Sequence, residues 1–230
     1  MTSSKKMRKS AIYTLVVLVI SLFLKCNDVY AENILIIGNS LTLHRPKPDI
    51  GWNGDWGMAA SSLENDYVHK LASILEKRNH TKVNVSIISA GVIEGNFFQS
   101  TVYNLSNNYH GRYDYIIIQI GDNINFTNPL KDTFYERYNS LLRTLNPKLS
   151  KKGILICLGK WWQSDWVDRE IKSTCEENGG KFVALKPISQ NLKSNASSER
   201  SFTNPGVGSH PGDWAMQKIA ESINQAINAE

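Results

Sequence analysis

The sequence predicts a three-layer α/β/α sandwich around a central, mostly parallel sheet of five strands. Two observations favour this fold class. Short apolar runs rich in Ile and Leu alternate with longer amphipathic stretches, which is typical of strands joined by helical crossovers. The apolar runs are continuous rather than alternating with polar residues, as expected for strands buried on both faces. The 230 residues and 41% apolar content suit one sizeable core.

The individual elements follow from local patterns. We expect strands at 33–37, 83–88, 115–120 and 153–158, with a weaker fifth at 182–185. Apolar residues recur at helical spacing at 63–77, 130–145 and 213–229, which predicts two crossover helices and a closing helix. The Ser- and Asn-rich stretch 193–207 contains a proline and predicts a loop. No linker interrupts 32–230, so one domain is expected there.

The first 31 residues differ in kind from the rest. Four basic residues precede an apolar run at 11–24, and Val29-Tyr30-Ala31 offers small residues at the positions that a signal peptidase reads. The apolar run has 14 residues, fewer than the roughly 20 that span a bilayer as a helix. This favours a cleaved secretory signal over an uncleaved membrane anchor at 11–24. We therefore expect a secreted or periplasmic protein without stable membrane insertion after cleavage.

The basic character of the chain belongs mainly to this leader. Five basic residues and one acidic residue lie within 1–31, so the formal net charge falls from +5 for the whole chain to +1 for 32–230. Phosphate binding needs a clustered basic surface. No nucleic-acid partner is expected.

Cysteines and histidines give no sign of a metal site. Cys157 lies in an apolar run, where a buried thiol is expected, and a bridge to Cys175 is the alternative in an oxidising compartment. His69, His80 and His110 are scattered, without cysteine or carboxylate at ligand spacing. No metal and no other cofactor is expected.

Polar residues stand where two predicted strands end and again near the C-terminus. Ser40 follows the first strand in a Gly-Asn-Ser turn, Asn123 follows the third in Gly-Asp-Asn, and His210 lies in Gly-Ser-His-Pro. Ligands bind outside the carboxyl ends of parallel strands, so one site is expected. Ester hydrolysis by serine needs a nucleophile, a base and oxyanion donors. Ser40 would be the nucleophile and His210 the base. The oxyanion donors would be the Ser40 N–H, the Gly95 N–H and the Asn123 side-chain amide.

These segments resemble the SGNH hydrolase superfamily, also called the GDSL esterases and lipases. The run 38–41 is similar to the first family block, with Asn39 in place of the usual Asp; 121–123 is similar to the third block and 209–211 to the fifth. The second block is matched loosely at 89–95, where Gly95 or Gly91 would be the oxyanion glycine. The resemblance spans the chain from residue 34 to its end. It implies a flavodoxin-like fold, acyl-ester hydrolysis or acyl transfer, and no metal.

One position departs from the family pattern. The family places an aspartate three residues before the histidine, and Val207 stands there. A carboxylate would hold the imidazole tautomer and stabilise the imidazolium. Its replacement could be Asp213, either Asp165 or Asp168 from an expected tryptophan-rich loop, or a backbone carbonyl.

The tryptophans suggest a substrate. All six lie in predicted loops or helix starts on the rim of the site, and four of them, Trp52, Trp56, Trp161 and Trp162, are candidate substrate-binding residues. Flat aromatic faces pack against sugar rings, so a carbohydrate-bearing substrate is expected; the alternative is that tryptophans anchor the long loop 43–62 over the sheet. The Gly- and Trp-rich run 50–58 predicts an ordered wall or lid beside the nucleophile, and His44 is a candidate lining residue.

The sequence therefore predicts an exported serine esterase that hydrolyses small acyl esters, with O-acetyl groups on a glycan as the expected substrate. One alternative is an O-acetyltransferase that uses the same residues. The other is a noncatalytic glycan-binding protein on a degenerate hydrolase scaffold, which the valine at 207 motivates.

Overall fold

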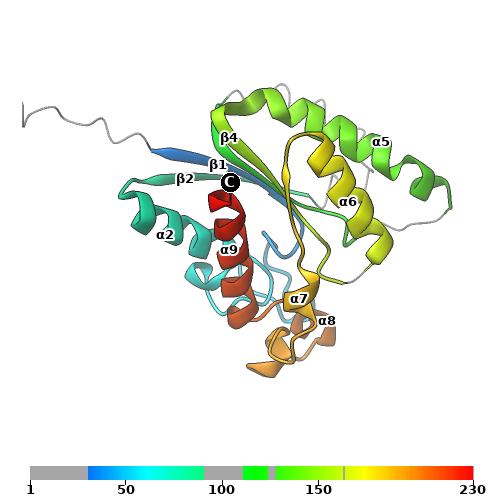
Figure 1. Ribbon diagram of the computed structural model, residues 1–230. Coiled ribbons are helices and arrows are strands. Elements are labelled where there is room, and N and C mark those ends of the chain that lie inside the picture. The colour runs from blue at the N-terminus through cyan, green and yellow to red at the C-terminus, as the bar shows by residue number, and fades with distance from the viewer. Residues whose placement is uncertain (1–30, 91–110, 124–127, 163, 230) are drawn as a thin grey trace, which may run out of the picture. The chain divides into compact units, whose positions relative to one another are not determined.

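Five parallel strands form the centre of the fold (Figure 1). The computed structural model describes residues 31–90, 111–123, 128–162 and 164–229. The strands are β1 (Glu32–Gly38), β2 (Val83–Ser89), β3 (Tyr113–Gln119), β4 (Leu149–Leu158) and β5 (Lys181–Val183). Their order is β2-β1-β3-β4-β5, and every neighbouring pair is parallel. The predicted fold class is confirmed. The strand order reverses between β1 and β3, which is where an open α/β sheet binds its ligands.

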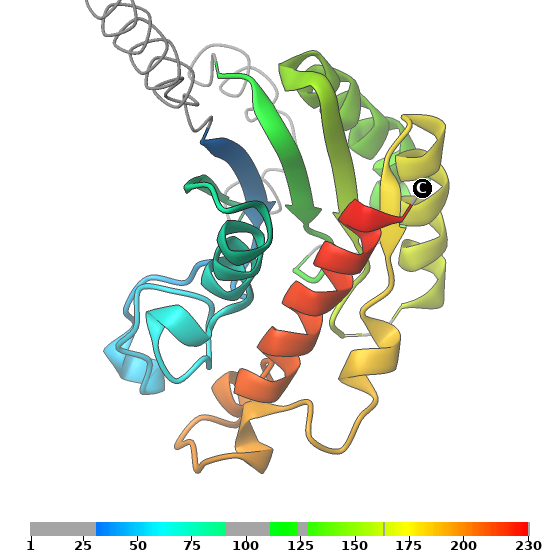
Figure 2. The same ribbon diagram turned by 60° about the vertical axis from the view of Figure 1, so that its left-hand side comes forward.

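Helices cover both faces of the sheet (Figures 1 and 2). On one face lie α2 (Tyr67–Asn79) and α9 (Asp213–Asn228), and on the other lie α5 (Asn128–Leu145) and α6 (Asp165–Glu177). Strand β1 shows why its sequence is apolar throughout. Ile34 and Ile36 pack on the α2 and α9 side while Leu35 and Ile37 pack on the α5 and α6 side, and all four are fully buried.

The start of α2 differs from the predicted helix at 63–77. Residues Leu63–Asn65 form a separate 3-10 turn, and α2 begins after Asp66. The Asp66 carboxylate accepts a hydrogen bond of 2.8 Å from the His69 N–H, so it caps the helix. The helix ends at His80, which adopts a left-handed conformation with φ 51°.

In the described part of the chain, three α-helices lie where the sequence patterns predict none: α6, α7 (Lys186–Ser189) and α8 (Pro205–Gly208). The expectation that Asp165 and Asp168 belong to a loop is wrong, because both lie in the first turn of α6. This helix buries a narrow apolar stripe that includes Val167 and Ile171, and charged residues dominate the rest of its surface. The predicted loop 193–207 ends inside the single-turn helix α8.

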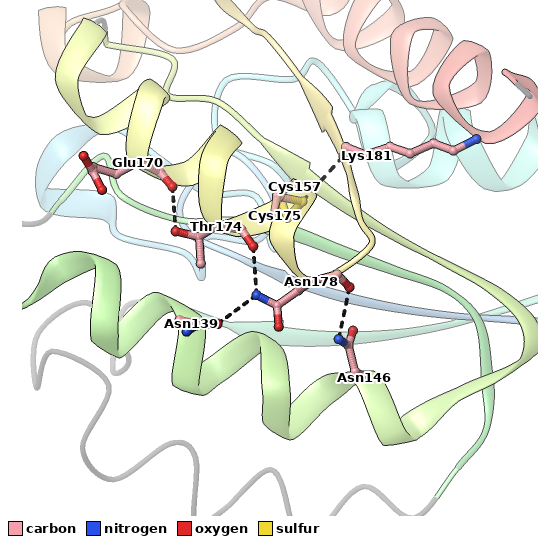
Figure 3. Close-up of a disulfide and its surroundings, with 8 residues drawn as sticks. All are labelled: Asn139, Asn146, Cys157, Glu170, Thr174, Cys175, Asn178 and Lys181. Atoms are coloured by element: carbon pink, nitrogen blue, oxygen red, sulfur yellow. Dashed lines mark hydrogen bonds between the residues drawn. A yellow bond between two sulfur atoms is a disulfide. The ribbon is translucent and has the colours of Figure 1, made fainter.

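A disulfide joins β4 to α6 (Figure 3). Cys157 and Cys175 are both fully buried, and their Cα atoms are 6.2 Å apart. The expected free thiol at Cys157 is therefore wrong, and the alternative pairing is the one present. Beside the bridge, the Asn178 side-chain amide donates to Asn139 of α5 and to the Thr174 carbonyl, each at 2.8 Å. The bridge and these bonds fasten the end of α6 to the sheet and to α5.

Residues 32–230 form one compact unit. Within the described ranges, no helix combines the length and the apolar character of a membrane span. The apolar run 11–24 and most of the predicted signal segment lie outside the described residues.

The disulfide is expected to stabilise the fold by about 3 kcal/mol, because it closes a chain segment with a sequence separation of 18. Urea unfolding should show that reductant lowers the stability of the wild-type protein by this amount. A Cys157→Ala/Cys175→Ala variant should have the lower stability from the start and should not respond to reductant. Two free thiols in the denatured, non-reduced wild-type protein would contradict this pairing.

Candidate active site

The turn after β1 brings Ser40 to the end of the sheet. A Cβ atom on Gly38 would lie 1.7 Å from the Thr42 side-chain oxygen, so a residue with a side chain does not fit there. Asn39 is buried, and its Oδ1 accepts a hydrogen bond of 3.1 Å from the Leu41 N–H. Its backbone carbonyl accepts a second bond, of 2.9 Å, from the Thr42 N–H. This Asn-capped turn fixes the backbone on both sides of Ser40.

His210 lies directly against Ser40. The Ser40 Oγ is 2.9 Å from Nε2 of the imidazole, and Nδ1 is 2.7 Å from the Gly206 carbonyl oxygen. A carbonyl only accepts hydrogen bonds, so Nδ1 carries the ring proton and donates it to Gly206. In the neutral ring, Nε2 then has its lone pair directed at the Ser40 hydroxyl. With this geometry His210 can accept the proton of the Ser40 hydroxyl.

A backbone carbonyl therefore occupies the place of the missing aspartate. The other candidates are engaged elsewhere: Asp213 accepts hydrogen bonds from Ser61, and Asp165 pairs with Lys186 at 2.8 Å. The third, Asp168, accepts a backbone N–H just after β4 at 2.9 Å. Val207 is buried in a small apolar cluster with Trp52.

Helix α8 positions this carbonyl. The Asn204 side chain accepts hydrogen bonds from the backbone N–H groups of Gly206 and Val207, at 2.8 and 3.3 Å, and so caps the single turn. The His210 N–H donates to the Val207 carbonyl at 3.1 Å, and the His210 carbonyl accepts from the Ala196 N–H at 2.8 Å. The histidine is thus held by its ring and by its backbone.

The surroundings of His210 favour the neutral ring. Burial lowers the pKa of His210 to about 4, against the opposing effect of the Gly206 hydrogen bond, and the charge of nearby His44 lowers it further. The Trp162 ring contributes to this burial, since it meets the imidazole edge to face with centroids 4.8 Å apart. At neutral pH the ring is therefore unprotonated and able to accept a proton.

One carboxylate connects the ends of three strands. Asp122, which follows β3, accepts hydrogen bonds through Oδ2 from the side-chain amides of Asn39 and Gln119, at 3.3 and 2.9 Å. Its Oδ1 accepts from the backbone N–H groups of Trp161 and Trp162, at 3.1 and 3.2 Å. The position of the Ser40 turn and that of the tryptophan beside His210 thus depend on the same side chain.

A cleft of about 900 Å³ brings several expected residues together. Ser40, Asn123, His210, Trp162 and His44 all line it. Its remaining walls are formed by Leu43, Arg45, Ile50, Met58, Ile87, Ser89, Asp122, Asn204, Gly206, Val207 and Ser209. Gly91 and Gly95 lie outside the described residues. The described chain holds no group of three or more His, Cys, Asp or Glu side chains placed to bind a metal.

The other three candidate tryptophans do not line the cleft. Trp52 is 6% exposed and Trp161 is 3% exposed, and their indole N–H groups donate to the carbonyls of His44 and Ser209. Trp56 packs edge to face on Trp52, with centroids 5.7 Å apart. These side chains hold the loop 43–62 and the chain before His210 in place, which is the alternative role considered for them.

Two features of the site have only faint signals in the sequence. The cap and first residue of α8, Asn204-Pro205, are typical of a helix start, and this pattern could have predicted the turn that supplies the Gly206 carbonyl. Asp122 stands out in the sequence only as the middle residue of Gly-Asp-Asn. Its four donors come from three separate segments, so no local pattern reveals them.

Several solved structures superpose on most of this chain. A protein described as a GDSL-like lipase, from Parabacteroides merdae, shares 18% identity with a TM-score of 0.56, covering 86% of this chain and 98% of that one. A second, from Bacteroides uniformis, shares 13% with a TM-score of 0.54, covering 85% and 94%. The esterase EstA from Pseudoalteromonas sp. shares 12% with a TM-score of 0.53, covering 85% and 96%. The chain has the SGNH hydrolase fold.

No protein-family model and no curated protein sequence matches the chain. At such low identities, the likeness to solved structures establishes the SGNH hydrolase fold and leaves the chemistry to this chain's own side chains. Within that fold, Ser40 follows β1, Asn123 follows β3 and His210 precedes α9. These places agree with the family blocks that the sequence resembles.

The Asp122 carboxylate is expected to be the main polar support of the site. Asp122→Asn should lower the free energy of unfolding by about 3 kcal/mol, because an amide nitrogen cannot accept the N–H groups that now face a charged oxygen. Urea denaturation measures the loss, and Glu136→Gln on the exposed surface of α5 should have little effect.

Asn39→Asp should also destabilise the protein, because it sets a second carboxylate against Asp122. The exchange Asn39→Asp/Asp122→Asn restores one donor and one acceptor across the pair, so it should be more stable than the sum of the two single losses predicts. Strict additivity would show that the two side chains do not interact.

Proposed function

We propose that this protein is a serine ester hydrolase that works through an acyl-enzyme. The observation that carries the proposal is the line of hydrogen bonds from Ser40 Oγ through the His210 ring to the Gly206 carbonyl, at 2.9 and 2.7 Å. It supplies a nucleophile, a neutral base and a group that fixes the tautomer of that base. The SGNH hydrolase fold and the cleft around Ser40 support the same activity.

The proposed reaction has two halves. Ser40 Oγ attacks the acyl carbon while its proton passes to Nε2 of His210, and the carbonyl electron pair moves onto the acyl oxygen. The tetrahedral intermediate then expels the alcohol, which takes the proton from Nε2, and the acyl group remains on Ser40. Water attacks the acyl-enzyme with His210 again as base, and the acid is released.

The negative oxygen of the intermediate needs donors. The backbone N–H of Ser40 and the side-chain amide of Asn123, which lines the same cleft, are the proposed donors among the described residues, with Gly95 or Gly91 as a third. One such donor typically contributes about 10²- to 10³-fold in rate.

The Gly206 carbonyl performs part of the work of an aspartate. In a serine triad the carboxylate sets the imidazole tautomer and also stabilises the imidazolium by its charge. The carbonyl sets the tautomer and offers only a partial negative charge. We therefore propose that this site acts on esters of small acyl groups with reactive acyl carbons, such as acetyl esters.

A carbohydrate is the proposed carrier of the acyl group. Trp162 lines the cleft beside His210 and presents an aromatic surface where the alcohol part of an ester would lie. With Trp52, Trp56 and Trp161 packed into the protein, this part of the proposal rests on the single indole of Trp162.

Export of the protein is proposed from two independent features. The segment 1–31 has the composition of a secretory signal, and the Cys157–Cys175 disulfide is of a kind that persists in oxidising compartments.

Release of p-nitrophenol from p-nitrophenyl acetate tests the proposed activity. Ser40→Ala and His210→Ala should each lower kcat/KM by at least about 10³-fold, because each removes a partner of the acyl-transfer step. Ser173→Ala on α6 and His80→Asn at the end of α2, two residues that do not line the cleft, should retain wild-type turnover. Equal rates in wild-type and Ser40→Ala protein, with circular dichroism showing both folded, would contradict a serine mechanism and favour a binding protein.

A further inference from the structure

The cleft has one rigid wall. Residues 43–58, here called the wall hairpin, double back so that the His44 N–H donates to the Trp56 carbonyl at 2.9 Å and the Lys47 N–H donates to the Trp52 carbonyl at 2.7 Å. The Trp52 indole N–H closes the hairpin on the His44 carbonyl at 2.9 Å. The backbone at His44 and Arg45, which both line the cleft, is therefore fixed beside Ser40.

Arg45 and Asp122 are the cleft-lining residues that carry a permanent charge. The Asp122 carboxylate already accepts four hydrogen bonds from the protein. No carboxylate in the described part of the chain forms an ion pair with Arg45. Among the described lining residues, the cleft thus offers a substrate one available positive charge and no available negative one.

His44 adds a second polar group next to Arg45. Its Nδ1 donates to the Arg45 carbonyl at 2.6 Å, so the ring nitrogen left for a ligand is Nε2, which donates a hydrogen bond to an anion in the protonated ring. His44 lines the same cleft as Ser40 and His210. A ligand group held by His44 and Arg45 would therefore lie near the reacting centre.

We propose that His44 and Arg45 form an anion-binding subsite, and that the ester which this protein hydrolyses carries a carboxylate on its alcohol part. The subsite rests on the proposed esterase activity and names its substrate class. The planar guanidinium matches a carboxylate with two parallel N–H bonds. A single cation balances the single charge of a carboxylate, whereas a phosphate monoester carries about −1.5 to −2.

A matched pair of aryl acetates measures the effect of this charge. The pair is 4-acetoxybenzoate and its methyl ester, and the quantity compared among variants is the ratio of their kcat/KM values. Arg45→Gln should lower this ratio about tenfold, because kcat/KM falls more for the anionic ester than for the methyl ester. His44→Gln should lower the ratio by a smaller factor. Arg169→Gln, on the exposed surface of α6, is the control and should leave the ratio unchanged.

A binding measurement separates this proposal from the esterase activity. Isothermal titration uses 4-acetamidobenzoate and its methyl ester, in which an amide replaces the scissile ester. The wild-type protein should bind the carboxylate at least tenfold more tightly than the methyl ester, and Arg45→Gln should remove the difference.

This preference is expected whether or not the protein hydrolyses the acetates, so the failure of the esterase proposal would be seen in the kinetics alone. Equal affinity for the two amides, no binding of either, or a preference that persists in Arg45→Gln would each overturn the subsite.

Discussion

The hydrogen bond from His210 Nδ1 to the Gly206 carbonyl is the interaction on which the site depends. It decides which ring nitrogen carries the proton and turns the other toward Ser40. The bond exists because Asn204 caps the single helical turn Pro205–Gly208, in which the Gly206 carbonyl lies four residues before His210 and accepts from its ring. A chain without this turn would lose the orientation of the His210 ring, and Asp213, Asp165 and Asp168 are engaged elsewhere.

The neutral Gly206 carbonyl and the burial of the His210 ring both act on the pKa of His210. The buried imidazole of His210 has a lowered pKa, since the Gly206 hydrogen bond compensates only part of the cost of burying the charged ring. The proposed base is therefore unprotonated at neutral and mildly acidic pH, but an imidazolium formed in the proposed reaction would be less well stabilised than in a triad. A site of this kind favours esters that need little assistance, which agrees with the small acyl groups proposed.

The hydrogen bond between Asn39 and Asp122 holds the turn after β1 against the turn after β3. The family resemblance leads one to expect an aspartate at position 39, and the structure shows what the asparagine does instead: its amide nitrogen donates to Asp122 while its oxygen caps the turn at Leu41. An aspartate at 39 would oppose the Asp122 carboxylate. The two positions are thus complementary in hydrogen bonding.

The sequence predicts the sheet well because strand burial leaves a strong local signal. All five strands fall within a few residues of their predicted bounds, and the central ones, such as β1, are apolar on both faces. Helix α6 was missed because its buried stripe is narrow among many charges. Likewise, Trp52 and Trp161 resemble surface sugar-binding residues in sequence, and only the tertiary structure shows that they are buried and bonded to backbone carbonyls.

The meeting of Ser40 and His210 follows from topology, since loops at the carboxyl ends of parallel strands share one edge. The partner of His210 could not be predicted in this way, because every residue has a backbone carbonyl and the sequence does not show which one accepts from the ring.

The most direct test of this account is a titration of His210 by nuclear magnetic resonance in ¹⁵N-histidine-labelled protein, assigned with His210→Ala. We predict a proton on Nδ1 and none on Nε2 at neutral pH, and a titration midpoint at about 4, where protonation of Nε2 would remove the base. A midpoint near the ordinary value of about 6.5, or a neutral ring protonated on Nε2, would contradict the central claim that a buried imidazole held by a backbone carbonyl activates Ser40.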